Sequence, residues 1–310
     1  YGTGLPVAGE YTGLLDNSGE RLRLEDGYGE KILEFTYDDL WSPITDGHGF
    51  SLAIADDTVE WTRWNDRESW RPNGILDGTP GLVDPPLPTL PPVVINEVLA
   101  HSTGPQEDAI ELHNPTDAPI DVGGWFLTDT FSAPEKYRLP SPTLIPALGF
   151  AVFTETHFNP TPGQPRSFAL GADGDDVWIF SADEAGRLTG YVQGFDFEAT
   201  ASGVSLGRHT NSVGDVDYPP LASVTLGDPN AAPRAGPVVI SEIMYHPAAT
   251  GIANQPASFI ELANISTTNV PLSDPAMPDS PWRLRNGVAF AFPPGAALPS
   301  GRRLLVVGFD

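Results

Sequence analysis

Apolar residues recur at every second position in short stretches of the chain. Leu22 and Leu24 alternate with Arg and Glu near the start, and Val288, Phe290 and Phe292 alternate with alanines near the end. Clusters of Gly, Pro, Asn or Asp bound these stretches, and none has the i, i+3, i+4, i+7 spacing of an amphipathic helix. The pattern predicts an all-β protein of short strands joined by turns, as in a β-sandwich with Greek-key connections.

One series of segments occurs twice in the same order. In each copy a strand-like segment containing Glu is followed by a second one that begins Ile-Glu-Leu and ends in Asn, and a Trp follows later. The signature residues are Glu97, Glu111, Asn114 and Trp125 in one copy and Glu242, Glu261, Asn264 and Trp282 in the other. Matches over this length indicate duplication of a whole domain rather than a solenoid repeat.

The opening of the chain resembles the end of the intact copy, because the motif Gly-x-Ser-Leu occurs at 49–52 and again at 203–206. One complete domain and two partial ones are therefore predicted. The C-terminal half of a first domain occupies residues 1–84, a complete domain occupies 93–230, and the N-terminal half of a third occupies 238–310. Residues 85–92 and 231–237 are predicted linkers, since their prolines fix φ and remove backbone donors.

Acidic residues far outnumber basic ones and are spread along the chain. The 41 Asp and Glu against 16 Lys and Arg give a formal net charge of -25. A field of this sign repels phosphate backbones and anionic lipid, so no nucleic acid is expected as a partner. The chain has no cysteine, which excludes disulfides, thiolate zinc sites and cysteine nucleophiles.

Targeting segments are also missing from the sequence. It has neither a secretory leader nor an apolar run of the ~20 residues that a membrane helix needs. Membrane insertion is therefore not expected. The start at Tyr1 is interpreted as lying inside a longer protein, with any signal peptide outside this sequence.

Several spaced motifs carry a family resemblance. Residues 238–247 read Val-Val-Ile-Ser-Glu-Ile-Met-Tyr-His-Pro, and the middle copy has Ile-Glu-Leu-His-Asn-Pro at 110–115 and Asp-Pro-Asn at 228–230. In this order the motifs resemble the lamin tail domain (LTD) of bacterial proteins. The resemblance implies tandem immunoglobulin-like β-sandwich domains. It also implies an extracellular or cell-surface multidomain protein, in which such domains often accompany CotH-like kinase domains or hydrolases.

The repeated carboxylates are the first candidates for chemistry. Strand parity places Glu97 on the same face as Ile95, and Glu242 recurs at the equivalent position. A half-buried carboxylate there must find hydrogen-bond donors. Glu111 and Glu261 are the repeated carboxylates that could serve as catalytic partners, but repetition in tandem copies favours an architectural role.

Residues 203–207 match the Gly-x-Ser-x-Gly nucleophile motif, with Ser205 at its centre. The chemistry of that motif needs an apolar strand before the Ser and a helix after it. The flanking residues predict neither. No catalytic residue is predicted, and the chain is not expected to be an enzyme.

Two other clusters have binding as one interpretation. Asp173, Asp175 and Asp176 resemble part of a calcium loop but lack the spacing and the terminal Glu of an EF-hand. A polar turn is favoured there, and no metal or cofactor is predicted. The candidates for stacking on a sugar or a partner surface are Trp61, Trp64 and Trp70, whose alternative role is packing within their own half-domain.

Together these features predict a non-catalytic interaction or spacer module of a larger secreted or cell-surface bacterial protein, with a protein or a glycan as partner. The alternatives are a hydrolase-associated fragment, with catalysis in a domain outside this sequence, and a calcium-stiffened adhesin. The two partial domains are expected to pair, within one chain or between chains. A half sandwich leaves an apolar face and open strand edges exposed.

Overall fold

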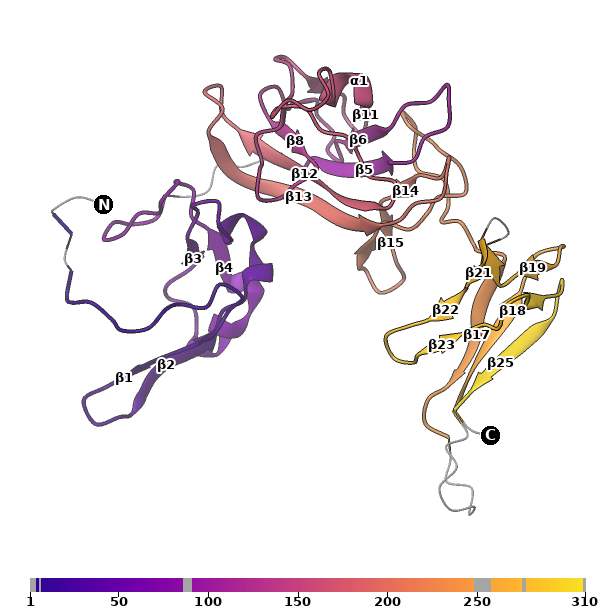
Figure 1. The fold of residues 1–310 in the computed structure, drawn as a ribbon. Helices are drawn as coiled ribbons and strands as arrows, with labels where there is room; N and C mark the ends of the chain where they lie inside the picture. Colours follow the sequence, from indigo (N-terminus) through magenta and orange to yellow (C-terminus); the bar gives the residue numbers. More distant parts are fainter. Residues whose placement is uncertain (1–3, 6, 86–90, 248–257, 275–276, 309–310) are drawn as a thin grey trace. The chain divides into compact units, whose positions relative to one another are not determined.

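The computed structural model describes residues 4–5, 7–85, 91–247, 258–274 and 277–308. The chain forms two compact units, Tyr1–Pro233 and Arg234–Asp310, both built mainly of short strands (Figure 1). The boundary between them lies within the predicted linker 231–237, whereas residues 86–90 of the other predicted linker lie outside the described residues. No helix in the described ranges is long and apolar enough to cross a lipid bilayer.

The first unit contains a two-layer sandwich of four-stranded antiparallel sheets (Figure 1). One sheet has the order β11-β6-β5-β14, with strands Phe150–Thr154, Ala109–His113, Val94–Leu99 and Leu206–Gly207. The other has the order β13-β12-β8-β9, with strands Leu188–Glu198, Gly174–Ala182, Phe126–Thr128 and Tyr137–Arg138. Two short pairs flank them, β7 (Ile120–Asp121) with β10 (Leu144–Ile145) and β15 (His209–Thr210) with β16 (Val216–Asp217). A single turn of helix, α1 (Glu155–Phe158), follows β11.

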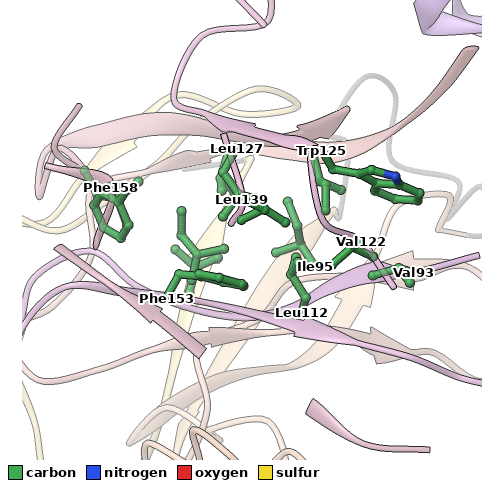
Figure 2. Close-up of a cluster of buried hydrophobic side chains, with 14 of the residues drawn as sticks. Val93, Ile95, Leu112, Val122, Trp125, Leu127, Leu139, Phe153 and Phe158 are labelled. Carbon is green, nitrogen blue, oxygen red and sulfur yellow. The ribbon is translucent and has the colours of Figure 1, made fainter. Parts of the chain in front are cut away.

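The core of the sandwich lies between the two sheets. Side chains at every second position meet there, for example Ile110 and Leu112 from β6 and Val177 and Ile179 from β12, all fully buried. Figure 2 shows Leu127 on one layer pointing toward residues of the other layer. The period-two pattern of the sequence is therefore the pattern of inward-facing side chains.

Residues before the sandwich form a smaller β-rich segment within the first unit. A hairpin of β1 (Arg21–Glu25) and β2 (Lys31–Thr36) is followed by a second pair, β3 (Leu52–Ile54) with β4 (Trp70–Pro72). Four 3-10 turns lie between or beside these strands, at Asp39–Trp41, Pro43–Thr45, Trp61–Asn65 and Arg67–Ser69.

This segment covers the outer face of β12. Ile44 and Phe50 form a second buried cluster with Phe126 and Phe180, which lie on the side of the sheet away from the core. The ring of His48 contacts Phe180 edge-on, with centroids 5.2 Å apart. Because β12 has apolar side chains on both faces, it needs this second cover as well as the core.

The second unit has a three-stranded sheet of order β17-β18-β25, with strands Val238–Met244, Phe259–Asn264 and Arg303–Val307. Six short strands that form three antiparallel pairs accompany this sheet. These strands are β19 (Val270–Pro271), β20 (Ser273–Asp274), β21 (Met277–Pro281), β22 (Arg283–Leu284), β23 (Phe290–Ala291) and β24 (Ala297–Leu298). They pair as β19 with β24, β20 with β21, and β22 with β23.

Strand registers in the second unit repeat those of the complete sandwich. β5 pairs with β6 through a register shift between Ile95 and Glu97, and β17 pairs with β18 through the same shift between Ile240 and Glu242. β7 and β10 have their counterparts in β19 and β24. In the described ranges, the strands of the second unit therefore correspond to β5 through β11 and include no counterpart of β12 to β14.

Adjacent residues of β10 give a test of this core. Ile145 is fully buried and Leu144 is exposed, although both lie on one two-residue strand. Ile145→Ala is expected to lower the free energy of unfolding by about 2–5 kcal/mol, because it leaves a cavity among packed side chains. Leu144→Ala should change it by less than about 0.5 kcal/mol. Urea denaturation of both variants checks this, and equal effects would contradict the described orientation of β10.

Candidate functional site

Two carboxylates, Glu97 and Glu111, lie opposite each other on β5 and β6, and both are fully buried. Cross-strand partners share a face of the sheet, and Glu111 lies between the core residues Ile110 and Leu112. The pair is therefore on the outer face. The β-bulge before Glu97 changes the strand parity, so the sequence-based expectation that Glu97 shares a face with Ile95 is wrong.

Donors from the end of the domain surround the Glu97 carboxylate. The Ser205 hydroxyl donates to its Oε1 at 2.6 Å. The backbone N–H of Thr225 donates to Oε1 at 2.8 Å, and the Thr225 hydroxyl donates to Oε2 at 2.7 Å. Both oxygens are thus bonded to residues more than a hundred positions away in the sequence.

The Glu111 carboxylate is held in a similar way. The Asn96 side-chain amide donates to Oε1 at 2.7 Å, and the Gly227 N–H donates to Oε2. Asn230 extends the network, because its amide donates to the carbonyls of Asn96 and Arg208, both at 3.1 Å. The closing segment from Thr225 to Asn230 is therefore fixed to the sheet through the two carboxylates.

Burial has the largest effect on the pKa of Glu111. It raises the pKa of this carboxyl from 4.5 to about 7, although the bonds from Gly227 and Asn96 act in the opposite direction. The nearby charges of Glu97 and Asp228 raise it further. Such a group could exchange a proton near neutral pH, but it is closed off from solvent and substrate.

The two Asn residues of the signature, Asn114 and Asn264, hold the turns that follow them through side-chain hydrogen bonds to the backbone. The Asn114 amide donates to the carbonyls of Ala118 and Pro146 at 2.7 and 2.9 Å, and its Oδ1 accepts from the Thr116 N–H at 2.9 Å. Asn264 makes the equivalent bonds in the second unit. Both side chains are buried with their polar atoms paired.

The other signature residues differ between the two copies. Trp125 is buried and packs on Tyr191 of β13, with ring centroids 5.8 Å apart, whereas Trp282 is partly exposed. Glu242 is exposed. Glu261 accepts a hydrogen bond from the Ser241 hydroxyl at 2.7 Å and forms an ion pair with Arg303.

The contacts of Glu261 shift its pKa in the opposite direction to that of Glu111. The Ser241 hydrogen bond and the Arg303 charge lower the pKa of Glu261, whereas burial raises that of Glu111. One sequence motif therefore carries carboxylates in opposite environments in the two copies.

Ser205 is fully buried and leads into β14. Its hydroxyl is bonded to Glu97, and the residues after it continue into the short strands β14 and β15 rather than a helix. The nucleophile motif at 203–207 therefore has no exposed hydroxyl.

Of the three aspartates, Asp173 lies in the turn before β12, whereas Asp175 and Asp176 lie within β12 opposite residues of β13. Asp175 accepts the backbone N–H groups of Gly171 and Asp176 at 2.8 and 2.9 Å, and burial raises its pKa. Asp173 does not take part in these bonds. Within the described parts of the chain, no cluster of three or more His, Asp or Glu is arranged to hold a metal ion.

Of the three tryptophans proposed for binding, two are packed inside the N-terminal segment. Trp64 and Trp70 lie edge to face with centroids 5.5 Å apart, and Trp70 also stacks on Phe35. The Trp70 indole N–H donates to the Trp64 carbonyl at 2.8 Å. Trp61 is 57% exposed, with the Lys31 ammonium 5.4 Å from its ring centre.

The sequence did not lead to a site role for the residues that complete the buried network, although Asn230 belongs to a motif of the family resemblance. They are Asn96, Thr225, Gly227 and Asn230. A signal for them existed, because the Gly-Asp-Pro-Asn motif at 227–230 closes the complete copy. It could have been paired with the buried Glu residues, which need donors from somewhere in the fold.

Two antiparallel sheets packed face to face form an immunoglobulin-like β-sandwich. Residues 87–193 match the family model of the Lamin Tail Domain, so this part of the chain is similar to that family. The match ends within β13, while β14 and the closing segment complete the same sandwich. The comparisons with curated proteins and with solved structures gave no match.

The raised pKa of Glu111 gives a pH prediction. Between pH 4.5 and about 7 the folded state keeps a proton that the unfolded state has released, so this group lowers stability as pH rises through that window. Relative to Glu111→Gln, the wild type should lose about 3 kcal/mol of unfolding free energy between pH 5 and pH 8. Urea denaturation at both pH values measures the difference.

Glu261→Gln is the matched control. The pKa of Glu261 is lowered, so its contribution is present above the unfolded pKa and is lost only as pH falls through the folded pKa. Its carboxylate is ionised in both states from pH 5 to pH 8, and this variant should show no pH-dependent difference there. A flat profile for Glu111→Gln as well would contradict the buried, proton-retaining state of Glu111.

Proposed function

We propose that the chain is a non-catalytic interaction and spacer module of a larger secreted or cell-surface protein, with a protein or a glycan as its partner. One observation carries this proposal. Glu97, Glu111 and Ser205, the side chains best suited to catalysis, are fully buried. The Ser205 hydroxyl donates to Glu97, and the Gly227 N–H donates to Glu111. A catalytic group must reach its substrate, whereas these groups close the sandwich.

The surface supports binding through aromatic contact rather than through charge. Trp61 presents its ring to solvent on a 3-10 turn, beside Lys31. An indole face is suited to stacking on a sugar ring or on an apolar partner surface. The net charge of -25 disfavours polyanionic partners.

Ser205→Ala tests the non-catalytic role. Loss of a hydrogen bond to a buried carboxylate is expected to lower the free energy of unfolding by about 2 kcal/mol, while any hydrolytic activity of the purified chain stays unchanged. Ser202→Ala, at an exposed position of the preceding loop, is the control and should be neutral in both measurements. An esterase activity that disappears in the folded Ser205→Ala protein would overturn the proposal.

Trp61→Ala tests the binding surface. The substitution is expected to weaken binding to a glycan or protein partner about tenfold, because a stacked aromatic contact is lost. A glycan array, followed by calorimetry on the strongest ligand, measures the change. Trp64→Ala serves as the comparison, since it removes a packed ring and should lower the melting temperature, which Trp61→Ala should leave nearly unchanged.

A further inference from the structure

Three arginines of this acidic chain surround one cavity of the complete sandwich. Arg138, Arg166 and Arg187 line a cavity of about 440 Å³, although the chain has 41 acidic and only 16 basic residues. Arg138 ends β9, Arg187 lies in the turn between β12 and β13, and Arg166 lies in the loop after α1. Three separate segments therefore bring positive charge to one place.

Arg138 is held by backbone carbonyls instead of by a carboxylate. Its Nε donates to the Gly124 carbonyl at 3.3 Å, and its Nη2 donates to the carbonyls of Asp183 at 3.3 Å and Glu184 at 2.7 Å. The guanidinium lies over the Phe126 ring, 5.9 Å from the ring centre. A guanidinium has five N–H donors, so these bonds leave the two N–H groups of Nη1 without a protein partner in the described ranges. The positive charge is therefore fixed in position without being neutralised.

Two glycines leave room for this guanidinium. Gly124 and Gly186 both have positive φ, at 88° and 83°. A Cβ at Gly124 would lie 3.3 Å from Nη2 of Arg138, and a Cβ at Gly186 would lie 3.8 Å from its Cζ. Glycine adopts such a backbone without steric cost, and a side chain at position 124 would crowd the guanidinium. The two turns therefore fit closely around this arginine.

The other two arginines differ in how far their charge is compensated. Arg187 forms an ion pair with Asp183 through its Nε at 3.0 Å, and 78% of its side chain remains exposed. Arg166 is exposed, and among the described residues neither Arg166 nor Arg138 forms an ion pair with a carboxylate. The cavity therefore has two positive charges that no carboxylate in the described part of the chain neutralises by direct contact.

A carboxylate lines the same cavity. Glu135 is exposed there, and in the described ranges it forms no ion pair with the arginines. An ionised carboxylate repels a second anionic group nearby, and it accepts hydrogen bonds from hydroxyl groups. The combination suits a ligand that has a single carboxylate together with hydroxyls. The net charge of -25 favours the same ligand, since it repels molecules with many negative charges.

We propose that this cavity binds one acidic sugar, a uronic acid, of a glycan. The sugar carboxylate accepts hydrogen bonds from Nη1 of Arg138 and from the Arg166 guanidinium, and a sugar hydroxyl donates to Glu135. Arginine is suited to this role because its planar N–H groups bind a carboxylate in a bidentate manner. A cavity of about 440 Å³ is within the range that holds small ligands.

This inference rests on the proposed function in taking a glycan as the partner, and it names the chemical class of that glycan. The site is separate from the exposed Trp61 ring, which does not line the cavity. Binding in the cavity depends on charge, whereas the contact at Trp61 depends on an aromatic face.

Calorimetry of the full chain with matched sugars tests the site. Methyl galacturonoside and methyl glucuronoside have a carboxylate where methyl galactoside and methyl glucoside have a hydroxymethyl group. At least one acidic sugar is expected to bind about tenfold more tightly than its uncharged counterpart, because charge-assisted hydrogen bonds form only with the carboxylate. The difference should shrink as the salt concentration rises from about 0.01 M to about 1 M.

Arginine variants locate the binding. Arg166→Gln should weaken the binding of the acidic sugar about tenfold and leave the melting temperature unchanged, because this side chain is exposed. Arg234→Gln is the matched control. It removes one positive charge at an exposed position outside the cavity and should change the affinity by less than about twofold. Arg138→Lys keeps the charge but loses the planar donors, so it should weaken binding about tenfold as well.

Several results would overturn the proposed site. They are equal binding of the acidic and uncharged sugars, an unchanged affinity in Arg166→Gln, an equal loss in Arg234→Gln, and tighter binding of an acetylated glutamyl peptide than of either acidic sugar. Binding of an uncharged glycan that is lost in Trp61→Ala, without any preference for acidic sugars, would overturn this inference and leave the proposed function standing.

Discussion

The buried pair of Glu97 and Glu111 is the constraint on which the complete sandwich depends. Two carboxylates taken out of water cost several kcal/mol unless donors replace the lost hydration. The donors come from Ser205, Thr225, Gly227 and a neighbouring amide, so the pair is stable only when the end of the domain is folded against its first strands. The two carboxyl groups therefore gain their hydrogen-bond donors only when the end of the domain closes the sandwich.

In the described part of the second unit, no closing segment lies against the equivalent strands. Glu242 is exposed, and Glu261 is compensated by Ser241 and Arg303 rather than by backbone N–H groups. Burial raises the pKa of Glu111, whereas hydrogen bonding and charge lower that of Glu261. Ser241 and Arg303 stand where the complete sandwich has Asn96 and Phe150, so these substitutions as well as the cover on the outer face of the sheet account for the difference.

Much of this architecture was predictable from the sequence, because apolar residues at every second position of a strand, such as Ile110 and Leu112, lie on the same face of the sheet. The position of Glu97 was not predictable, since the bulge beside Asn96 leaves no local signal and one extra residue reverses the face of every side chain near it. The packing of Ile44 on Phe180 was also missed. It joins positions far apart in the sequence, and no alternation pattern encodes such a contact.

A carboxylate pair of this kind also restricts which strands can pair. Copies of the same strands recur along the chain, so apolar side chains alone would permit pairing in several registers. A slip of one residue would turn Glu111 into the core and Leu112 out of it. The charged group would then be buried without donors, at a cost of several kcal/mol. A hydrophobic pair at the same positions would be stable in more arrangements, so the carboxylates select the one register in which Ser205 and Thr225 reach them.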